Sequence, residues 1–228
     1  MRLIFIGDST MQQNFVGKYP QCGWPQAMPL FLKNEVEIYN FGKNGCSTKS
    51  YLELGLFNKA LEYVNEESYC FIEFGHNDQK IQDSNRYTRP FIEYYDNLVY
   101  FIKEIQKRNG NVILLTPIYR RIFKDNKLVE NTHLNYPEAM KKVANDLNIF
   151  LIDLTSLTFD LISDLGDEKS KKLFMNFKEG LYENYPNGLE DNTHLRFEGA
   201  FQISKLVVNE LIKVNHPIIQ YLQKDTNL

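Results

Sequence analysis

Short apolar runs alternate along the chain with longer segments in which apolar residues recur at helical spacing. Runs of this length and composition are typical of buried strands, and we expect strands at 2–6, 35–40, 69–74, 111–116 and 148–154. The longer segments predict helices at 10–16, 24–32, 52–64, 91–108, 136–147, 155–175 and 198–214. Strands that alternate with helices throughout a chain indicate a parallel sheet covered on both faces.

The predicted fold class is therefore α/β, with a five-stranded parallel sheet in a three-layer α/β/α sandwich. The chain has 228 residues, of which 43% are hydrophobic, and that is enough for one sizeable core. No repeat, low-complexity tract or linker divides it, so we expect one domain over 1–228, peripheral after about residue 216. The polar stretches 78–89, 118–135 and 176–193 are expected to be loops.

Charge and cysteine content exclude several classes of protein. The net charge is -3, from 26 basic and 29 acidic residues, which favours neither nucleic acid nor a membrane surface as a partner. Cys22, Cys46 and Cys70 are too widely spaced for a disulfide framework or a zinc site, so we expect buried thiols. The apolar run after Arg2 is too short for a signal peptide, and no segment reaches the length of a transmembrane helix. A cytoplasmic protein is expected.

The sequence Gly7-Asp8-Ser9-Thr10 directly follows the first predicted strand. A serine there lies at the carboxyl end of a strand, where open α/β sheets bind their ligands. Nearby helix N–H groups would favour an oxyanion. The alternative is that these residues only cap a helix, because such caps have the same composition. Taken alone, the four residues support both interpretations equally.

A second stretch, Asp191-Asn192-Thr193-His194, precedes the last predicted helix. In a tight turn, a spacing of three residues lets the Asp191 carboxylate accept a hydrogen bond from one imidazole nitrogen of His194. The other nitrogen is then free to take a proton from a serine hydroxyl. This stretch therefore favours a catalytic role for Ser9 over a capping role.

Acyl transfer also requires hydrogen-bond donors for the oxyanion of the transition state. Loops 7–10, 42–50 and 75–78 each follow a strand, so all three should emerge at one edge of a parallel sheet. They offer the backbone N–H groups of Ser9 and Gly45 and the side-chain amide of Asn77. Gly42 competes with Gly45 for this role.

The four stretches together resemble the four conserved blocks of the SGNH (GDSL-type) hydrolases. The blocks are Gly-Asp-Ser at 7–9, a glycine in the second loop, Gly-His-Asn-Asp at 75–78 and Asp-Asn-Thr-His at 191–194, and they span nearly the whole chain. Longer strings are similar to the rhamnogalacturonan acetylesterase branch of that family. They lie at 7–11, 40–51, 73–78, 117–121 and 136–140.

The resemblance implies a flavodoxin-like sandwich with Ser9 as nucleophile, His194 as general base and Asp191 as the residue that orients it. It implies an oxyanion hole made by Ser9, Gly45 and Asn77. The substrate would be an acetyl ester on a pectic sugar, with no metal or other cofactor.

Five more residues are candidates for substrate contact, and each has a structural alternative. A buried histidine is more often structural, and a lone tryptophan more often packs in the core than stacks on a sugar. Paired arginines can bind uronate carboxylates but are also common surface charges. The candidates are His76, His133, Trp24, Arg120 and Arg121.

We expect a serine esterase that removes O-acetyl groups from carbohydrate through an acetyl-enzyme, with acetylated rhamnogalacturonan oligosaccharides as the first choice of substrate. The alternatives on the same fold are an acetylxylan esterase, a lipase or a thioesterase. An alternative of another class is a carbohydrate-binding protein on an inactive hydrolase scaffold. Loss of Ser9, Asn77 or His194 would favour that last reading, and all three are present. The oligomeric state stays open.

Overall fold

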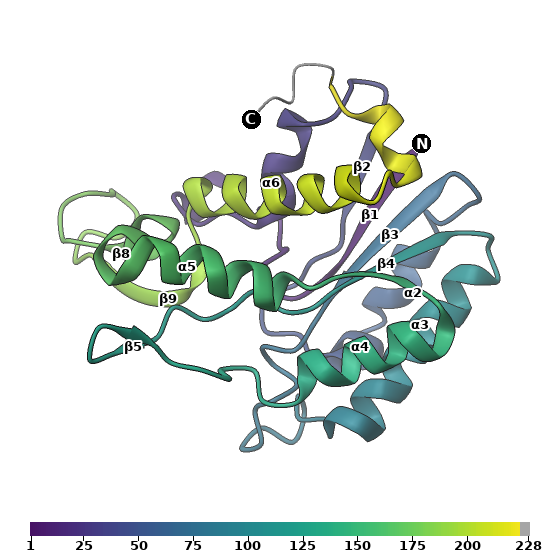
Figure 1. Ribbon diagram of the computed structural model, residues 1–228, viewed down its shortest axis with the longest axis horizontal. Coiled ribbons are helices and arrows are strands. Elements are labelled where there is room, and N and C mark those ends of the chain that lie inside the picture. Colours follow the sequence, from purple (N-terminus) through teal and green to yellow (C-terminus); the bar gives the residue numbers. More distant parts are fainter. Residues whose placement is uncertain (224–228) are drawn as a thin grey trace.

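A five-stranded, wholly parallel sheet forms the centre of the molecule in the computed structural model, which describes residues 1–223 (Figure 1). Its strands are β1 (Arg2–Gly7), β2 (Glu37–Asn40), β3 (Ser68–Glu73), β4 (Asn111–Leu115) and β7 (Phe150–Ile152). Their order across the sheet is β2-β1-β3-β4-β7. This is the flavodoxin-like order, so the predicted sheet is confirmed.

Helices cover both faces of the sheet, as Figure 1 shows: α5 and α6 lie on one side, and α2, α3 and α4 on the other. The expected three-layer arrangement is confirmed. The α-helices are α1 (Thr48–Glu53), α2 (Leu56–Leu61), α3 (Tyr95–Gln106), α4 (Tyr136–Leu147), α5 (Leu154–Ser170) and α6 (Phe197–Lys213). The shorter helical turns are η1 (Val16–Lys18), η2 (Trp24–Leu30), η3 (Pro90–Tyr94), η4 (Lys171–Leu173) and η5 (Pro217–Tyr221).

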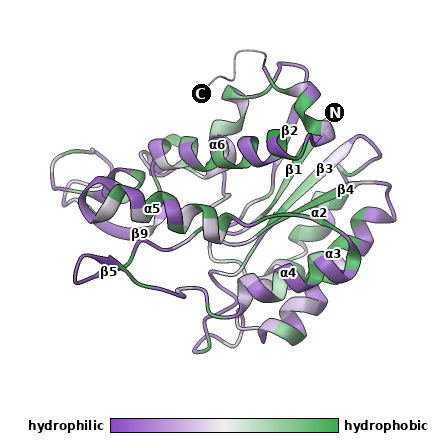
Figure 2. Cartoon of the chain, in the orientation of Figure 1, coloured by the Kyte–Doolittle hydropathy of each residue, from purple (hydrophilic) through white to green (hydrophobic). Residues whose placement is uncertain are grey.

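Successive side chains of β1 point to opposite faces of the sheet and pack in two separate apolar cores. Leu3 and Phe5 pack on the side of η2 and α6, whereas Ile4 and Ile6 pack on the side of α2, α3 and α4. All four side chains are fully buried, and each contributes about 1.5–3 kcal/mol relative to an exposed position. Figure 2 shows the strands as a hydrophobic centre between helices that are hydrophobic on one side only. The end of β1, just before Ser9, is therefore packed on both faces.

The predicted helix at 10–16 is wrong. Residues after β1 make a single turn, in which the N–H of Met11 donates to the carbonyl of Asp8 at 3.3 Å. The Gln26 side chain then accepts from the backbone N–H groups of Asn14 and Gly23, each at 2.9 Å. A partly buried polar side chain thus satisfies backbone groups that a helix would have satisfied. Ser9 consequently does not cap a helix.

Three other predicted segments differ from the structure. The helix expected at 52–64 is broken at Gly55, whose φ of 67° only glycine adopts readily, and it becomes α1 and α2. The connection 118–135 contains a short hairpin of β5 (Phe123–Lys124) and β6 (Lys127–Leu128). The expected loop at 176–193 is a loop at 178–188, but its two ends belong to an antiparallel ribbon of β8 (Phe174–Phe177) and β9 (Leu189–Leu195).

The segment after residue 216 packs on the body of the protein. Ile218 is fully buried, and the N–H of Lys33 donates to the carbonyl of Tyr221 at 2.9 Å. The remainder of that predicted peripheral segment, 224–228, lies outside the described residues. The three cysteines are free and buried, as predicted.

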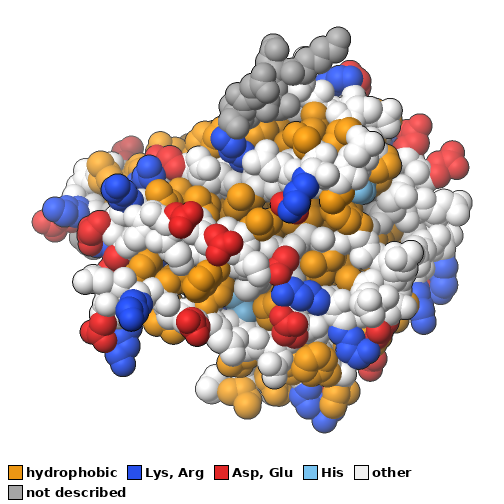
Figure 3. Space-filling view, in the orientation of Figure 1, with side chains coloured by type: hydrophobic (Ala, Val, Ile, Leu, Met, Phe, Trp, Pro, Cys, Tyr) orange, Lys and Arg blue, Asp and Glu red, His pale blue; other side chains and the backbone are white. Residues whose placement is uncertain are grey.

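Acidic and basic side chains are interspersed over the face of the molecule shown in Figure 3. Among the helices within residues 1–223, none combines the length and the apolar character needed to cross a membrane.

Candidate active site

The four sequence blocks meet in one cleft of about 510 Å³ at the carboxyl end of the sheet. Loops after β1, β2 and β3 form one side, and the 191–194 segment of β9 joins them, so the predicted convergence is confirmed. Apart from one glycine, every residue that lines the cleft has a polar side chain. The lining residues are Ser9, Asn44, Gly45, His76, Asn77, Lys80, Arg86, Arg120, Asp191, Thr193 and His194.

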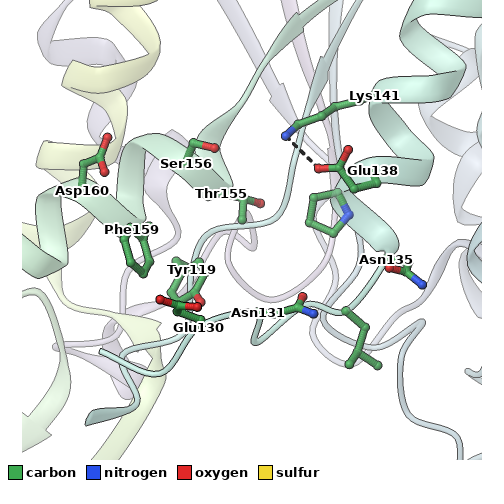
Figure 4. Close-up of a pocket in the computed structure, with 12 residues that line it drawn as sticks. Tyr119, Glu130, Asn131, Asn135, Glu138, Lys141, Thr155, Ser156, Phe159 and Asp160 are labelled. Carbon is green, nitrogen blue, oxygen red and sulfur yellow. Dashed lines mark hydrogen bonds and ion pairs between the residues drawn. The ribbon is translucent and has the colours of Figure 1, made fainter. Parts of the chain in front are cut away.

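A second hollow, of about 480 Å³, lies between the 118–135 connection, α4 and the start of α5 (Figure 4). Its lysine, Lys141, is paired with Glu138 at 3.1 Å and with Asp153 at 2.8 Å. None of the four sequence blocks contributes a residue to its lining. The cleft that contains Ser9 is therefore the better candidate for chemistry.

The turn that carries Ser9 is fixed by the buried carboxylate of Asp8. Asp8 Oδ1 accepts from both the backbone N–H and the hydroxyl of Thr10, each at 3.0 Å. Ser9 itself is 7% exposed and lines the cleft. The serine is thus held at the edge of the sheet by hydrogen bonds beneath it and not by a following helix.

His76 supports the same turn. Its Nδ1 lies 3.1 Å from Asp8 Oδ2, and its Nε2 lies 3.0 Å from the carbonyl oxygen of Ile118. Both partners accept hydrogen bonds, so both ring nitrogens are engaged within the protein, but His76 also lines the cleft, and its substrate contact stays a prediction. Burial acts to raise the pKa of Asp8, but the charge and hydrogen bond of His76, together with Thr10, lower it below its usual value.

Glu73 is a second buried acid beside this turn, and no sequence motif predicted a role for it. Its carboxyl group contacts the Thr10 hydroxyl at 2.9 Å and accepts from Trp24 Nε1 at 2.7 Å. Burial and the charge of Asp8 raise the pKa of Glu73 to about 8. The sequence signal that could have revealed this buried acid is a glutamate inside the apolar run 69–74. Trp24 is fully buried, so its tentative role in stacking on sugar is wrong.

The segment 191–194 bulges out of the β8–β9 ribbon. Asn176 pairs with Glu190 and Phe174 pairs with Leu195, so these four residues lie opposite a single residue of β8. Bulges of this kind redirect side chains and are frequent next to active sites. The polar composition of the segment gave no indication that it belongs to a strand.

Within the bulge, the Asp191 carboxylate makes the predicted hydrogen bond to His194. Asp191 Oδ2 accepts from His194 Nδ1 at 2.6 Å, while Oδ1 accepts the backbone N–H groups of Thr193 and His194 at 2.8 and 3.0 Å. Burial acts to raise the pKa of Asp191, but these hydrogen bonds and the charge of His194 lower it. The carboxylate therefore fixes both the turn and the imidazole.

Arg121 clamps the bulge to α5 and does not face the cleft. It is 3% exposed; its N–H donates to the carbonyl of Asn192 at 2.9 Å, and its Nη1 donates to Asn192 Oδ1 at 2.6 Å. Its Nε donates to Ser170 Oγ at 2.9 Å, and its guanidinium also pairs with Asp167. All of these donors are engaged, so the tentative substrate contact of Arg121 is wrong.

His133 and Arg120 have different positions relative to the cleft. His133 is 1% exposed and does not line the cleft, so its tentative substrate role is wrong; its Nε2 lies 2.8 Å from the carbonyl oxygen of Ile118. Arg120 does line the cleft, where its guanidinium donates to the carbonyls of Thr132 and His76, each at 3.0 Å.

Three hydrogen-bond donors in the cleft are free. The backbone N–H groups of Ser9 and Gly45 have no partner among residues 1–223. Asn77 Nδ2 donates one hydrogen to the carbonyl of Cys46 at 2.9 Å, which leaves its second hydrogen available. The N–H of Gly42 is already bound to Asn40 Oδ1 at 2.8 Å, so Gly42 no longer competes with Gly45.

Asp78 ties the third loop to α1. It is fully buried and accepts from the Thr48 hydroxyl at 2.6 Å, the Thr48 N–H at 3.0 Å and the Thr88 hydroxyl at 2.8 Å. Burial raises the pKa of Asp78 to about 7, although these hydrogen bonds lower it. Asp78 is thus the loop-stabilising acceptor and not a second acid in the cleft.

The hydroxyl of Ser9 and the imidazole of His194 line the same cleft without a hydrogen bond between them in the described part of the chain. In ligand-free enzymes, catalytic hydrogen bonds are often long and tighten only when substrate binds. The remaining lining residues are Asn44, Lys80, Arg86 and Thr193, none of which was predicted to have a role. Asn44 and Thr193 lie inside two of the sequence motifs, whereas no motif marks Lys80 or Arg86.

The sequence and the fold of this chain are similar to those of known proteins. The model of the GDSL-like Lipase/Acylhydrolase family matches residues 5–189. Rhamnogalacturonan acetylesterase RhgT of Bacillus subtilis is 33% identical over 97% of this chain and 94% of its own length, and the probable rhamnogalacturonan acetylesterase YesY of the same organism is 28% identical over 98% of both. The crystal structure of the Bacillus subtilis protein YxiM superposes with a TM-score of 0.76 at 20% identity, over 95% of this chain and 57% of that longer chain.

Proposed function

Since the chain belongs to the GDSL-like lipase/acylhydrolase family, we propose that it is a serine esterase that removes O-acetyl groups from carbohydrate, with acetylated rhamnogalacturonan oligosaccharides as its substrate. The names of the relatives RhgT and YesY, which are similar along almost their whole length, support this substrate. The observation that carries the chemistry is the 2.6 Å hydrogen bond between Asp191 and His194 in the cleft that Ser9 lines.

Ser9 is the nucleophile of this proposal. Its Oγ attacks the acetyl carbon while His194 Nε2 takes the hydroxyl proton, and the carbonyl π electrons move to the oxygen. The Asp191 carboxylate holds the proton on Nδ1, so that Nε2 is the acceptor, and it stabilises the imidazolium that forms. The bond to the sugar oxygen then breaks, and His194 returns the proton to that oxygen. Water, activated by the same imidazole, hydrolyses the acetyl-enzyme.

The free N–H groups of Ser9, Gly45 and Asn77 serve as the oxyanion hole. They are held before the reaction begins, so their dipoles need no reorganisation when negative charge develops. Removing one such donor typically costs about 2.7–4 kcal/mol of transition-state stabilisation. Three preorganised donors supply a large part of the rate enhancement that an esterase needs.

The polar lining of the cleft favours a short acyl group on a sugar over a fatty acyl chain. A lipase or thioesterase requires an apolar channel for its acyl group, and no lining residue within the described chain is apolar. Acyl-chain profiling tests this: 4-nitrophenyl acetate should be hydrolysed with a much higher kcat/KM than the butanoate or octanoate. A preference for octanoate would overturn the acetylesterase assignment.

The decisive experiment is Ser9→Ala. We expect kcat on 4-nitrophenyl acetate, and acetate release from acetylated rhamnogalacturonan oligosaccharides, to fall by at least about 10³-fold, because no nucleophile remains. Circular dichroism and the melting temperature should match those of the wild type, since the Ser9 hydroxyl makes no hydrogen bond within residues 1–223. Activity that survives in a folded variant would overturn the proposal, and an inactive wild type would favour a carbohydrate-binding protein.

A further inference from the structure

The candidate cleft carries an excess of positive charge. Three cations line it, Lys80, Arg86 and Arg120, whereas its single lining carboxylate, Asp191, is already bound to His194. The buried carboxylate of Asp8 beneath the cleft is likewise paired, with His76. The cleft therefore offers cationic groups to whatever enters it.

Two of the three cations are held by the protein itself. Arg86 forms an ion pair with Asp83 at 3.1 Å. Its guanidinium also lies beside Gly45, because a Cβ built on Gly45 would be 3.4 Å from Arg86 Nη2. Arg120 donates to two backbone carbonyls, which fixes its position without neutralising its charge.

Lys80 is different, because its ammonium group has no hydrogen-bond or ion-pair partner among residues 1–223. Its backbone is nevertheless well placed: the N–H of Lys80 donates to the carbonyl of Asn77 at 3.1 Å, so the residue belongs to the same turn as a proposed oxyanion donor. Partial burial lowers the pKa of Lys80, and the nearby charges of Arg86 and Arg120 lower it further, whereas Asp83 and Asp8 act in the opposite direction. An anion between these groups would relieve that repulsion.

We propose that the Lys80 ammonium, flanked by Arg86 and Arg120, binds the carboxylate of an acidic sugar in the saccharide whose acetyl ester faces Ser9. This inference rests on the proposed esterase function and adds a specificity-determining residue to it. A hydrogen bond between two charged groups is stronger than one between neutral groups, and it forms only with a substrate that carries a carboxylate. Lys80 thus favours acetylated uronate-containing oligosaccharides over neutral acetylated ones.

The test compares three acetyl esters on the full chain: acetylated galacturonate-containing oligosaccharides, acetylated xylo-oligosaccharides and 4-nitrophenyl acetate. The variants are Lys80→Gln, Lys80→Glu and the conservative Lys80→Arg. The matched control is Lys59→Gln, because Lys59 is an exposed lysine on α2 that does not line the cleft.

We expect Lys80→Gln to lower kcat/KM for the uronate substrate about tenfold, equivalent to about 1.4 kcal/mol, through a higher KM, while kcat changes little. Lys80→Glu should lower kcat/KM for the uronate substrate further, and Lys80→Arg should retain most of it. The kcat/KM values for the two neutral esters should be the same in all variants. The wild-type preference for the uronate substrate should shrink between 10 mM and 0.5 M NaCl, because salt screens the pair.

Equal kcat/KM for the uronate substrate in wild type, Lys80→Gln and Lys80→Glu would overturn the inference, as would an equal loss on all three esters. Hydrolysis of 4-nitrophenyl acetate distinguishes a failure of the Lys80 inference from a failure of the proposed esterase function. The proposed esterase fails if Ser9→Ala retains that hydrolysis, whereas the Lys80 inference fails if the charge at residue 80 has no effect that depends on the substrate carboxylate.

Discussion

Asn77 Nδ2 donates a hydrogen bond of 2.9 Å to the carbonyl oxygen of Cys46, so the loop after β3 is joined to the loop after β2 beside Gly45. The side-chain amide of Asn77 thus has two roles in the proposed enzyme. One N–H holds the loop that carries the Gly45 donor, and the other N–H is free to bind the oxyanion. Each role predicts a separate measurable effect.

Asn77→Ala should lower kcat for acetyl esters by about 10²–10³-fold, which is the usual effect of removing one oxyanion donor. The same change leaves the buried Cys46 carbonyl without its partner, which should lower the free energy of unfolding by about 1–3 kcal/mol. Kinetics with 4-nitrophenyl acetate and urea denaturation check the two effects. A loss of stability with unchanged kcat would remove Asn77 from the oxyanion hole.

Asp191→Asn should lower kcat by about 10³–10⁴-fold, because the amide no longer holds the proton on Nδ1 of His194 and the imidazole presents the wrong tautomer. The shape of the side chain is conserved, so the fold should persist. Asp160→Asn is the control, since Asp160 is exposed and lines only the second hollow of Figure 4. If the Asp160 variant were the inactive one, the chemistry would belong to that hollow.

Gly45→Ala and Gly55→Ala form a matched pair. Both glycines have positive φ, 77° and 67°, so each alanine should cost about 1–2 kcal/mol of stability. A Cβ on Gly45 would be in ordinary contact with Arg86 Nη2 at 3.4 Å, and the strained backbone would lie in the proposed oxyanion hole, whereas a Cβ on Gly55 meets nothing within 4 Å. Only Gly45→Ala should therefore also lower kcat, on the order of 10²-fold, as a displaced oxyanion donor would. Equal kcat in the two variants would exclude Gly45 as a donor.

Glu73 makes the stability depend on pH. Its pKa in the folded protein is about 8, above its value in an unfolded chain, so the fold binds this proton more tightly. That contribution is complete below about pH 4.5 and is lost as the pH rises through 8, with a slope of up to about 1.4 kcal/mol per pH unit.

Glu73→Gln, which is neutral at every pH, should flatten this dependence in guanidinium denaturation at pH 5, 6, 7 and 8. The pH dependence of the free energy of unfolding that remains in Glu73→Gln should include the contribution of Asp78, whose pKa is raised to about 7. Glu66→Gln, at an exposed position, should retain the wild-type slope. An unchanged slope in Glu73→Gln would mean that this carboxyl group is ionised in the fold.

The centre of the sheet was predictable because its interior strands β1, β3 and β4 are buried on both faces and therefore read as apolar runs. The turn after β1 was not, because Gln26, twelve residues beyond Asn14, satisfies its backbone groups, and no local pattern reveals such a partner. β9 was missed for a related reason. Its one partner strand within residues 1–223 is β8, and its bulge breaks the alternation by which a strand is recognised.

Motif spacing predicted the residues that meet in the cleft, but it did not predict which neighbours face it. Trp24 lies in the core because its indole finds an acceptor in Glu73, which sequence alone does not pair with it. Arg121 and Arg120 are adjacent in the chain, yet Arg121 turns away to clamp Asn192 whereas Arg120 lines the cleft. Such choices depend on tertiary partners and not on residue type.

Among the described residues, the bulge at 191–194 belongs to a ribbon that shares no strand with the central sheet, whereas Ser9 lies just after β1, an interior strand of that sheet. The two halves of the proposed catalytic machinery are thus anchored in separate backbone ladders, and the ribbon is the smaller and more polar of the two. Local opening requires less free energy than global unfolding. Esterase activity should therefore be lost reversibly on warming, at temperatures where the sheet and its layers of helices are still folded.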